Sequence, residues 1–260
     1  MINLRKLFIF FLVISAVIPA ADASYITMKS SITATDNAAA IIISNLGDEP
    51  SYNVQLSLDA NGKNSVSDVK KQLNVRESFR WQIPLHFESK NPGKYPLVLT
   101  TNYQDANSYP FSAISVFIFD NNESTISSLA AMISNVELAD KGVLELKIKN
   151  TAETAKDASI RLIAPKELTA DKDSLNLHLA SKEQATANFE IEKFSALKGS
   201  SYAVFAVIEY DEGGRHYTST ANGLIKIIEK KNIFANNALL AFILIALIII
   251  FVYFQFKKKK

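Results

Sequence analysis

An uncharged apolar segment near the C-terminus places the strongest constraint on this 260-residue chain. No charged residue occurs between Ile233 and Phe256, and four lysines at 257–260 follow directly. As a helix rising ~1.5 Å per residue, such a segment is long enough to cross the ~30 Å hydrocarbon layer of a bilayer. The sequence therefore predicts one transmembrane α-helix at 233–256 and a cytoplasmic basic tail at 257–260, because lysines after a span favour the cytoplasmic side.

The other end of the chain, residues 1–23, has the pattern of a secretory signal peptide. Two basic residues precede an apolar stretch at 7–18, and the small residues Ala21 and Ala23 occupy the positions that a signal peptidase reads. We expect cleavage between Ala23 and Ser24. The bulk of the chain would then lie outside the cytoplasmic (plasma) membrane, as in a type I single-pass protein. An uncleaved N-terminal anchor is the alternative.

Charge and cysteine content narrow the classes of function for the central part, residues 24–232. It carries 22 of the 28 basic residues and 25 of the 26 acidic ones, a formal net charge of −3. A mildly acidic domain does not fit nucleic-acid binding, which needs a basic surface. The chain has no cysteine, which excludes disulfides, cysteine-ligated zinc and cysteine nucleophiles.

Short segments in which apolar and polar residues alternate predict an all-β ectodomain. In the first half we expect strands at 26–33, 38–45, 52–59, 69–75, 79–87, 95–103 and 109–119. In the second half we expect them at 132–138, 142–149, 157–163, 173–179, 184–191, 201–210 and 215–228. Seven expected strands in each half, about 100 residues long, match the strand content of an immunoglobulin-like sandwich. The sequence thus predicts two tandem sandwiches, at 24–120 and 131–229, joined by a linker at 121–130.

The two halves also repeat one another. An alternating strand ends in Asn45 and is followed by a polar turn and a second alternating strand, and the same order recurs at Asn150. Two tyrosine pairs that bracket an apolar strand recur 107 residues apart: Tyr95 and Tyr103, then Tyr202 and Tyr210. Asparagine at such a point closes a strand and starts a turn, because its side chain bonds neighbouring backbone groups.

On these residues the chain resembles the CARDB and NEW3 class of extracytoplasmic immunoglobulin-like modules of archaeal and bacterial surface proteins. The segment Asn45-Leu46-Gly47 matches the pattern of that class, whereas Asn150-Thr151-Ala152 departs from it by lacking the glycine. The resemblance implies an immunoglobulin-like fold in tandem and a place just outside a membrane anchor. It implies no activity, because modules of that class share none.

Residue patterns for catalysis, metals or cofactors are absent from the sequence. The three histidines, His86, His178 and His216, fall in different predicted strands and lack the spacing of zinc ligands. There is no nucleophile elbow and no phosphate-binding loop. We therefore expect no enzyme activity, no catalytic residue, no metal and no cofactor. Calcium at Asp211 and Glu212 is an alternative, but this segment also reads as an ordinary hairpin turn.

Two further residues are candidate surface sites. Trp81 shares one face of a predicted strand with Phe79 and Ile83, which favours a place in the core; a binding aromatic that stacks on carbohydrate is the alternative. Asn122 begins the sequence Asn-Glu-Ser, an acceptor for N-glycosylation, within the predicted linker.

Together these features predict a membrane-anchored surface protein. Its tandem modules would act as a non-catalytic binding or structural ectodomain, in adhesion or as an envelope scaffold. The expected partners are the lipid bilayer, through 233–256, and a protein or surface polysaccharide outside the membrane. One alternative is an accessory subunit of a membrane secretion, transport or polysaccharide-export complex. Another is an enzyme with a site between the two modules.

Overall fold

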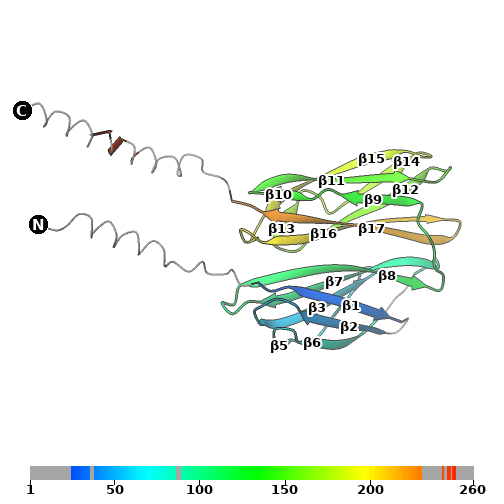
Figure 1. Cartoon of the computed structure of the whole chain (residues 1–260). Coiled ribbons are helices and arrows are strands. Elements are labelled where there is room, and N and C mark those ends of the chain that lie inside the picture. The colour runs from blue at the N-terminus through cyan, green and yellow to red at the C-terminus, as the bar shows by residue number, and fades with distance from the viewer. Residues whose placement is uncertain are drawn as a thin grey trace, which may run out of the picture. The chain divides into compact units, whose positions relative to one another are not determined.

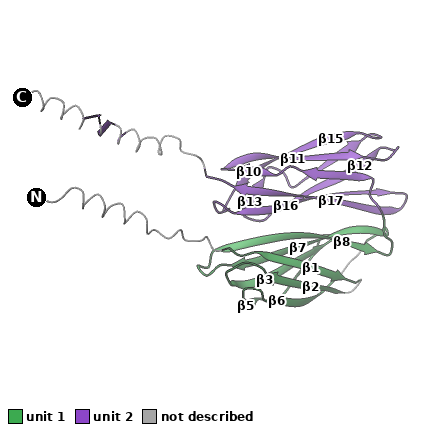
Figure 2. Cartoon of the chain, in the orientation of Figure 1, with its two compact units in different colours: residues 1–125 green, residues 126–260 purple. Residues whose placement is uncertain are grey.

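The computed structural model describes residues 25–35, 38–85 and 89–229, together with Phe242, Ile245, Ala246, Ile248 and Ile249 (Figure 1). Every regular element described before residue 230 is a β-strand, so the predicted all-β fold is confirmed. The chain divides into two compact units, residues 1–125 and 126–260 (Figure 2). The predicted signal peptide and its cleavage position lie outside the described residues.

The first unit is built from two antiparallel sheets. One has the order β1-β2-β6, and the other has the order β8-β7-β3, with β4 and β5 both paired to β3. The bounds are β1 Met28–Ala34, β2 Ala38–Asn45, β3 Ser51–Ala60, β4 Lys63–Val66, β5 Lys70–Leu73, β6 Ser78–Pro84, β7 Gly93–Gln104 and β8 Pro110–Asn121.

The second unit repeats this plan. One sheet has the order β13-β15-β11-β9, and the other has the order β14-β12-β16-β17, with β10 parallel to β17. The bounds are β9 Leu129–Ile133, β10 Val136–Leu138, β11 Lys141–Asn150, β12 Lys156–Ile163, β13 Leu168–Ala170, β14 Ser174–Leu179, β15 Gln184–Lys193, β16 Ser201–Glu212 and β17 Arg215–Ile227. This division of strands between two sheets is that of an immunoglobulin-like sandwich.

Alternation along the strands separates the core from the surface. In β2 the side chains of Ala39, Ile41 and Ile43 are buried, and in β11 those of Leu144 and Leu146 are buried. Each unit has its own cluster of buried apolar residues. Fully burying one such aliphatic side chain contributes roughly 1.5–3 kcal/mol. These clusters therefore provide the main stabilisation of a chain that has no cysteine.

A tyrosine near the start of the equivalent strand fixes the same corner in each unit. The Tyr95 hydroxyl at the start of β7 donates to the carbonyl of Asn91 at 2.8 Å. The Tyr202 hydroxyl at the start of β16 accepts from the backbone N–H of Leu197 at 3.0 Å. A tyrosine that bonds back to the backbone just upstream is a feature of immunoglobulin-like sandwiches. Tyr95 and Tyr202, the first tyrosine of each repeated pair, thus have the same structural role.

The asparagine at the end of β2 joins the two sheets of the first unit. Asn45 is fully buried. Its Nδ2 donates to the carbonyl of Glu49 at 2.6 Å and to that of Leu73, at the end of β5, at 3.4 Å, while its Oδ1 accepts from the N–H of Gly47 at 3.0 Å. One side chain therefore closes the turn after β2 and links it to a strand of the opposite sheet.

Asn150 makes the same connection in the second unit. It is also fully buried, and its Nδ2 donates to the carbonyls of Thr154, Leu179 and Ala180 at 2.8, 3.2 and 2.9 Å. Its Oδ1 accepts from the N–H of Ala152 at 3.0 Å. Both asparagines are thus turn formers, as the sequence indicates, and both also connect the sheets.

Gly47, in the turn after Asn45, has no counterpart in the turn after Asn150, and the reason is local. A Cβ on Gly47 would collide with the backbone carbonyl of Tyr25, which passes close to the turn. In the same place Asp48 donates its N–H to that carbonyl at 3.0 Å and accepts from the Tyr25 N–H at 2.7 Å. The chain segment ahead of β1 therefore requires glycine at this turn.

The largest difference from the predicted strands is at 132–138, where one strand was expected. The structure has two short strands there, because the chain crosses from one sheet to the other. β9 pairs with β11, and β10 pairs with β17 in the opposite sheet. At the crossing, Ser134 N–H donates to the Glu145 carbonyl at 3.1 Å, and Asn135 Oδ1 accepts from Leu224 N–H at 2.9 Å. The short strands β4 and β13 were not predicted.

Replacing the asparagine of the first unit should cost much of that unit's stability. We expect Asn45→Ala to lower the free energy of unfolding by roughly 2–3 kcal/mol, because it leaves buried backbone groups without partners. The only tryptophan, Trp81, lies in this unit, so urea unfolding of a 24–229 fragment followed by tryptophan fluorescence reports on it. The matched control is Asn107→Ala at an exposed turn, which should change stability by less than ~0.5 kcal/mol. Equal effects of the two variants would contradict the role given to Asn45.

Candidate functional site

The structure does not bring the two described histidines, His178 and His216, into one site. His86 lies outside the described residues. His178 is on β14 and His216 on β17, and β12 and β16 lie between those strands, a separation of about 14 Å at ~4.8 Å per strand. The His178 ring is exposed, and its Nδ1 pairs with Asp157 Oδ1 at 2.7 Å. Among the described residues, no group of three or more His, Asp or Glu side chains is placed to hold a metal ion.

His216 has a carboxylate on each side of its ring. Its Nδ1 lies 2.9 Å from Asp211 Oδ1 and its Nε2 lies 3.3 Å from Glu209 Oε1. Both carboxylates come from β16, the hairpin partner of β17. Partial burial lowers the pKa of His216, but the hydrogen bonds to Glu209 and Asp211 and their negative charges outweigh it and raise that pKa above its usual value.

An ion pair between a buried lysine and a half-exposed glutamate lies next to this hairpin and was not anticipated from the sequence. Lys156, at the start of β12, is only 4% exposed, and its Nζ lies 2.6 Å from Glu212 Oε1. The ammonium also donates to Thr154 Oγ1 at 2.5 Å. Asp211 and Glu212, the alternative calcium ligands, are thus engaged with His216 and Lys156. The pair is formed by residues 56 positions apart, so no local pattern signals it.

The hairpin turn itself has the predicted form. Gly213 and Gly214, between β16 and β17, have φ values of 58° and 73°. Two consecutive residues in this left-handed region make the tight turn that a two-residue hairpin prefers, and glycine adopts it without steric cost.

Trp81 lies on β6 and is partly buried against the core cluster of the first unit. Its ring packs edge-on against Phe79, with centroids 4.2 Å apart, and Lys70 Nζ lies 4.6 Å from the centre of the Phe79 ring. These contacts give Trp81 a packing role. A role as a binding aromatic stays a prediction.

Asn122, the candidate glycosylation site, follows β8 and is exposed. Its φ is +60°, a left-handed conformation that asparagine tolerates better than most residues. The Nδ2 atom donates to Asn121 Oδ1 at 3.3 Å. Exposure leaves the side-chain amide accessible, and its modification stays a prediction.

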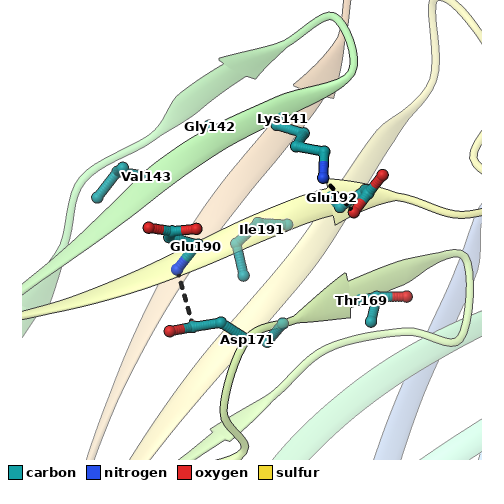
Figure 3. Close-up of a pocket in the computed structure, with 9 residues that line it drawn as sticks. Lys141, Gly142, Val143, Thr169, Asp171, Glu190, Ile191 and Glu192 are labelled. Carbon is teal, nitrogen blue, oxygen red and sulfur yellow. Dashed lines mark hydrogen bonds and ion pairs between the residues drawn. The ribbon is translucent and has the colours of Figure 1, made fainter.

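A shallow hollow on the second unit is the candidate binding site of the described surface. It opens beside the ends of β11, β13 and β15 and has a volume of about 390 Å³ (Figure 3). That is near the lower end of the ~300–1,000 Å³ range of small-ligand pockets. We call it the β11–β15 hollow; it is lined by Lys141, Gly142, Val143, Thr169, Ala170, Asp171, Glu190, Ile191 and Glu192.

The polar groups of the hollow are mostly acidic and partly paired. Lys141 Nζ lies 2.8 Å from Glu192 Oε2, and Asp171 Oδ1 accepts from Glu190 N–H at 2.9 Å (Figure 3). Desolvation raises the pKa of Asp171, but the bonds from Glu190 N–H and Lys172 outweigh it and lower that pKa below its usual value. Asp171 thus stays ionised in the hollow, and a carboxylate accepts hydrogen bonds from hydroxyl or ammonium groups.

Sequence reasoning missed this hollow for a clear reason. Glu190 and Glu192 alternate with buried Ile191 along β15, as surface residues of any half-buried strand do. Asp171 follows β13, a three-residue strand that the pattern did not predict. Only the pairing of β13 with β15 brings these carboxylates together.

Comparison with known proteins identifies no family. No protein-family profile and no curated protein sequence matches the chain. Among solved structures, Escherichia coli α-2-macroglobulin is similar at 11% identity with a TM-score of 0.32, over 78% of this chain and 17% of that chain.

Two smaller solved proteins also match. The YadV chaperone is similar at 10% identity with a TM-score of 0.31, over 75% of this chain and 100% of that chain. A non-cellulosomal cohesin from the archaeon Archaeoglobus fulgidus is similar at 14% identity with a TM-score of 0.29, over 42% of this chain and 98% of that chain. At these TM-scores the likenesses carry no argument about this chain.

The pair of carboxylates around His216 should make stability depend on pH. A histidine whose pKa is raised by folding contributes stability that is fully present below the unfolded-state pKa of ~6.5 and is lost as pH rises through the folded-state pKa. We therefore expect thermal unfolding of the 24–229 fragment to shift to lower temperature as the pH rises above about 6.5. His216→Gln should remove this part of the pH dependence.

The control for this measurement is His178→Gln, which replaces the exposed histidine of the same unit. This variant should keep the slope that His216 causes. A His216→Gln profile parallel to that of the unmodified fragment would show that the carboxylates of β16 do not hold the ring as described.

Proposed function

We propose that this chain is a single-pass, type I protein of the cytoplasmic membrane, whose two immunoglobulin-like units form a non-catalytic binding or structural ectodomain. The observation that carries the proposal is the uncharged segment 233–256 with four lysines after it. It follows closely on β17, the last strand of the second unit, which ends at Ile227. A folded sandwich is thus connected to a span-length apolar segment by only a few residues.

The described residues of that segment support the proposal. Phe242, Ile245, Ile248 and Ile249 have helical conformation, and their side chains are 54–71% exposed. Large apolar side chains exposed along a helix are unfavourable in water and favourable in lipid. No helix made only of described residues is long and apolar enough to cross a membrane, and most of 233–256 lies outside the described residues.

The use of polar side chains within the units supports a binding or structural role. His216 and Lys156 are the side chains best suited to acid–base chemistry, and both are bonded to carboxylates of β16. Asn45 and Asn150 are occupied in connecting sheets. A protein or surface polysaccharide would therefore bind at the outer faces, the loops, the sheet edges or the β11–β15 hollow. The match of Asn45-Leu46-Gly47 to the CARDB and NEW3 class supports assigning the units to such surface modules.

A second candidate function is that of an accessory subunit in a membrane secretion, transport or polysaccharide-export complex. It is favoured by the same exposed helical side chains, because they can pack against the helices of another membrane protein as well as against lipid. Photo-crosslinking from position 248 in native membranes distinguishes the two candidate functions. A specific integral membrane protein in the product supports the subunit, whereas crosslinking to lipid alone supports a freestanding surface protein.

The absence of native cysteine makes the predicted topology directly measurable. We expect Lys147→Cys, on an exposed position of β11, to react with a membrane-impermeant maleimide in intact spheroplasts. A cysteine added after Lys260 should react only after permeabilisation. The control Ala206→Cys, at a fully buried position, should stay unreactive until the protein unfolds. Labelling of the added C-terminal cysteine in intact spheroplasts would refute the orientation.

Membrane integration needs its own measurement. The full chain should stay in the membrane pellet through alkaline carbonate extraction, because lipid holds an integrated helix by apolar contact rather than by charge. A chain that stops after Glu229 should appear in the soluble fraction. Ile245→Leu should behave as the full chain does. Complete extraction of the full chain by carbonate would refute the anchor.

A further inference from the structure

The loop between β15 and β16, residues 194–200, leaves apolar side chains uncovered at one end of the second unit. Phe194 is 78% exposed and Leu197 is 37% exposed. The backbone of this loop is nevertheless held in place: Phe194 N–H donates to the Glu167 carbonyl at 3.0 Å, and Leu197 N–H donates to the Tyr202 hydroxyl at 3.0 Å. The two side chains are therefore presented by a fixed loop.

This loop lies where the chain leaves the second unit. Gly199 N–H donates to the Ile227 carbonyl at 2.8 Å, and Ile227 N–H donates to the Ser200 carbonyl at 2.9 Å. Two residues further on, Glu229 Oε1 lies 3.4 Å from Lys198 Nζ. Loop 194–200 is thus bonded directly to the last described residues before the apolar segment.

The length of chain between the unit and the apolar segment limits their separation. Ile233 follows Glu229 by four residues, which span at most ~14 Å when fully extended. The headgroup layer on each side of a bilayer is roughly 5–8 Å thick. When 233–256 crosses the membrane, this end of the second unit therefore lies next to the headgroups.

The charges around the loop suit that position. Lys193 precedes Phe194 directly, and Lys198 follows Leu197. Both lysines are partly exposed and are paired with single carboxylates, Lys193 with Asp140 at 3.5 Å and Lys198 with Glu229 at 3.4 Å. Such surface pairs are weak and exchange readily. Exposed Phe and Leu side chains next to lysines are the composition of segments that lie in the membrane interface.

We propose that loop 194–200 docks on the phospholipid headgroup layer, with Phe194 and Leu197 inserted among the lipids and Lys193 and Lys198 near the phosphates. This inference rests on the proposed membrane anchor, which brings the loop to the bilayer. Docking gives the second unit a preferred orientation on the membrane, because the loop and the end of β17 then form two attachments instead of one.

The test uses the full chain reconstituted in phospholipid vesicles, with tryptophan placed in the loop. In a Trp81→Phe background, Phe194→Trp puts the only tryptophan at the proposed contact; at a side chain this exposed, a larger ring disturbs no core packing. We expect brominated phospholipids to quench its emission at least twofold. The matched control is Ile126→Trp in the same background. It replaces an apolar side chain that is 86% exposed beside the opposite end of the unit, and it should not be quenched.

The outcomes distinguish the docking from the anchor. Quenching at position 194 and none at 126, in vesicles whose protein resists carbonate, supports the docking. Carbonate resistance without quenching at 194 overturns the docking and leaves the anchor in place. Emission at 194 that is unquenched but shifts to shorter wavelength as the protein-to-lipid ratio rises assigns the loop to a second copy of the chain, which also overturns the lipid contact. Extraction of the chain by carbonate overturns both.

Discussion

The architecture of each unit depends on one buried carboxamide. The side chains of Asn45 and Asn150 have no access to water, and each bonds to the turn after its own strand and to a strand of the opposite sheet. Apolar contacts between two sheets are not directional, so they set no particular turn geometry. A fully satisfied buried polar group does, because misplacing it leaves several hydrogen bonds unmade. The asparagine therefore fixes where β2 and β11 end and how the next strand enters the other sheet.

Features governed by local alternation were predictable from the sequence. The segment 38–45 was expected as a strand and is β2, because every second side chain along it faces the core. The glycine pair after Glu212 was expected as a hairpin turn, because its conformation depends on its own backbone. The repeated asparagines and tyrosines indicated two similar sandwiches: Asn45 and Asn150 make the same kinds of hydrogen bond, and the Tyr95 and Tyr202 hydroxyls both bond to the backbone just upstream.

Features that depend on distant partners were not predictable. Nothing in the segment 132–138 alone says that the chain changes sheets at Ser134, because the reason lies in β11 and β17. The burial of Lys156 is explained by Glu212, and the β11–β15 hollow by the pairing of β13 with β15. In each case one residue looks ordinary in its own strand. Its role is set by a neighbour that only the fold supplies.

The parallel pairing of β10 with β17 bears on how the second unit carries load. β17 is the last strand before the apolar segment. It is bonded along its length to β16 and, near its end, to β10 in parallel. Tension applied between the first unit and the apolar segment would act first on the pairing of β9 with β11, and then would pull the start of β10 and the end of β17 in opposite directions. The hydrogen bonds between these strands would then be sheared together instead of being opened one after another. Such a junction resists rupture better than a hairpin peeled from its open end.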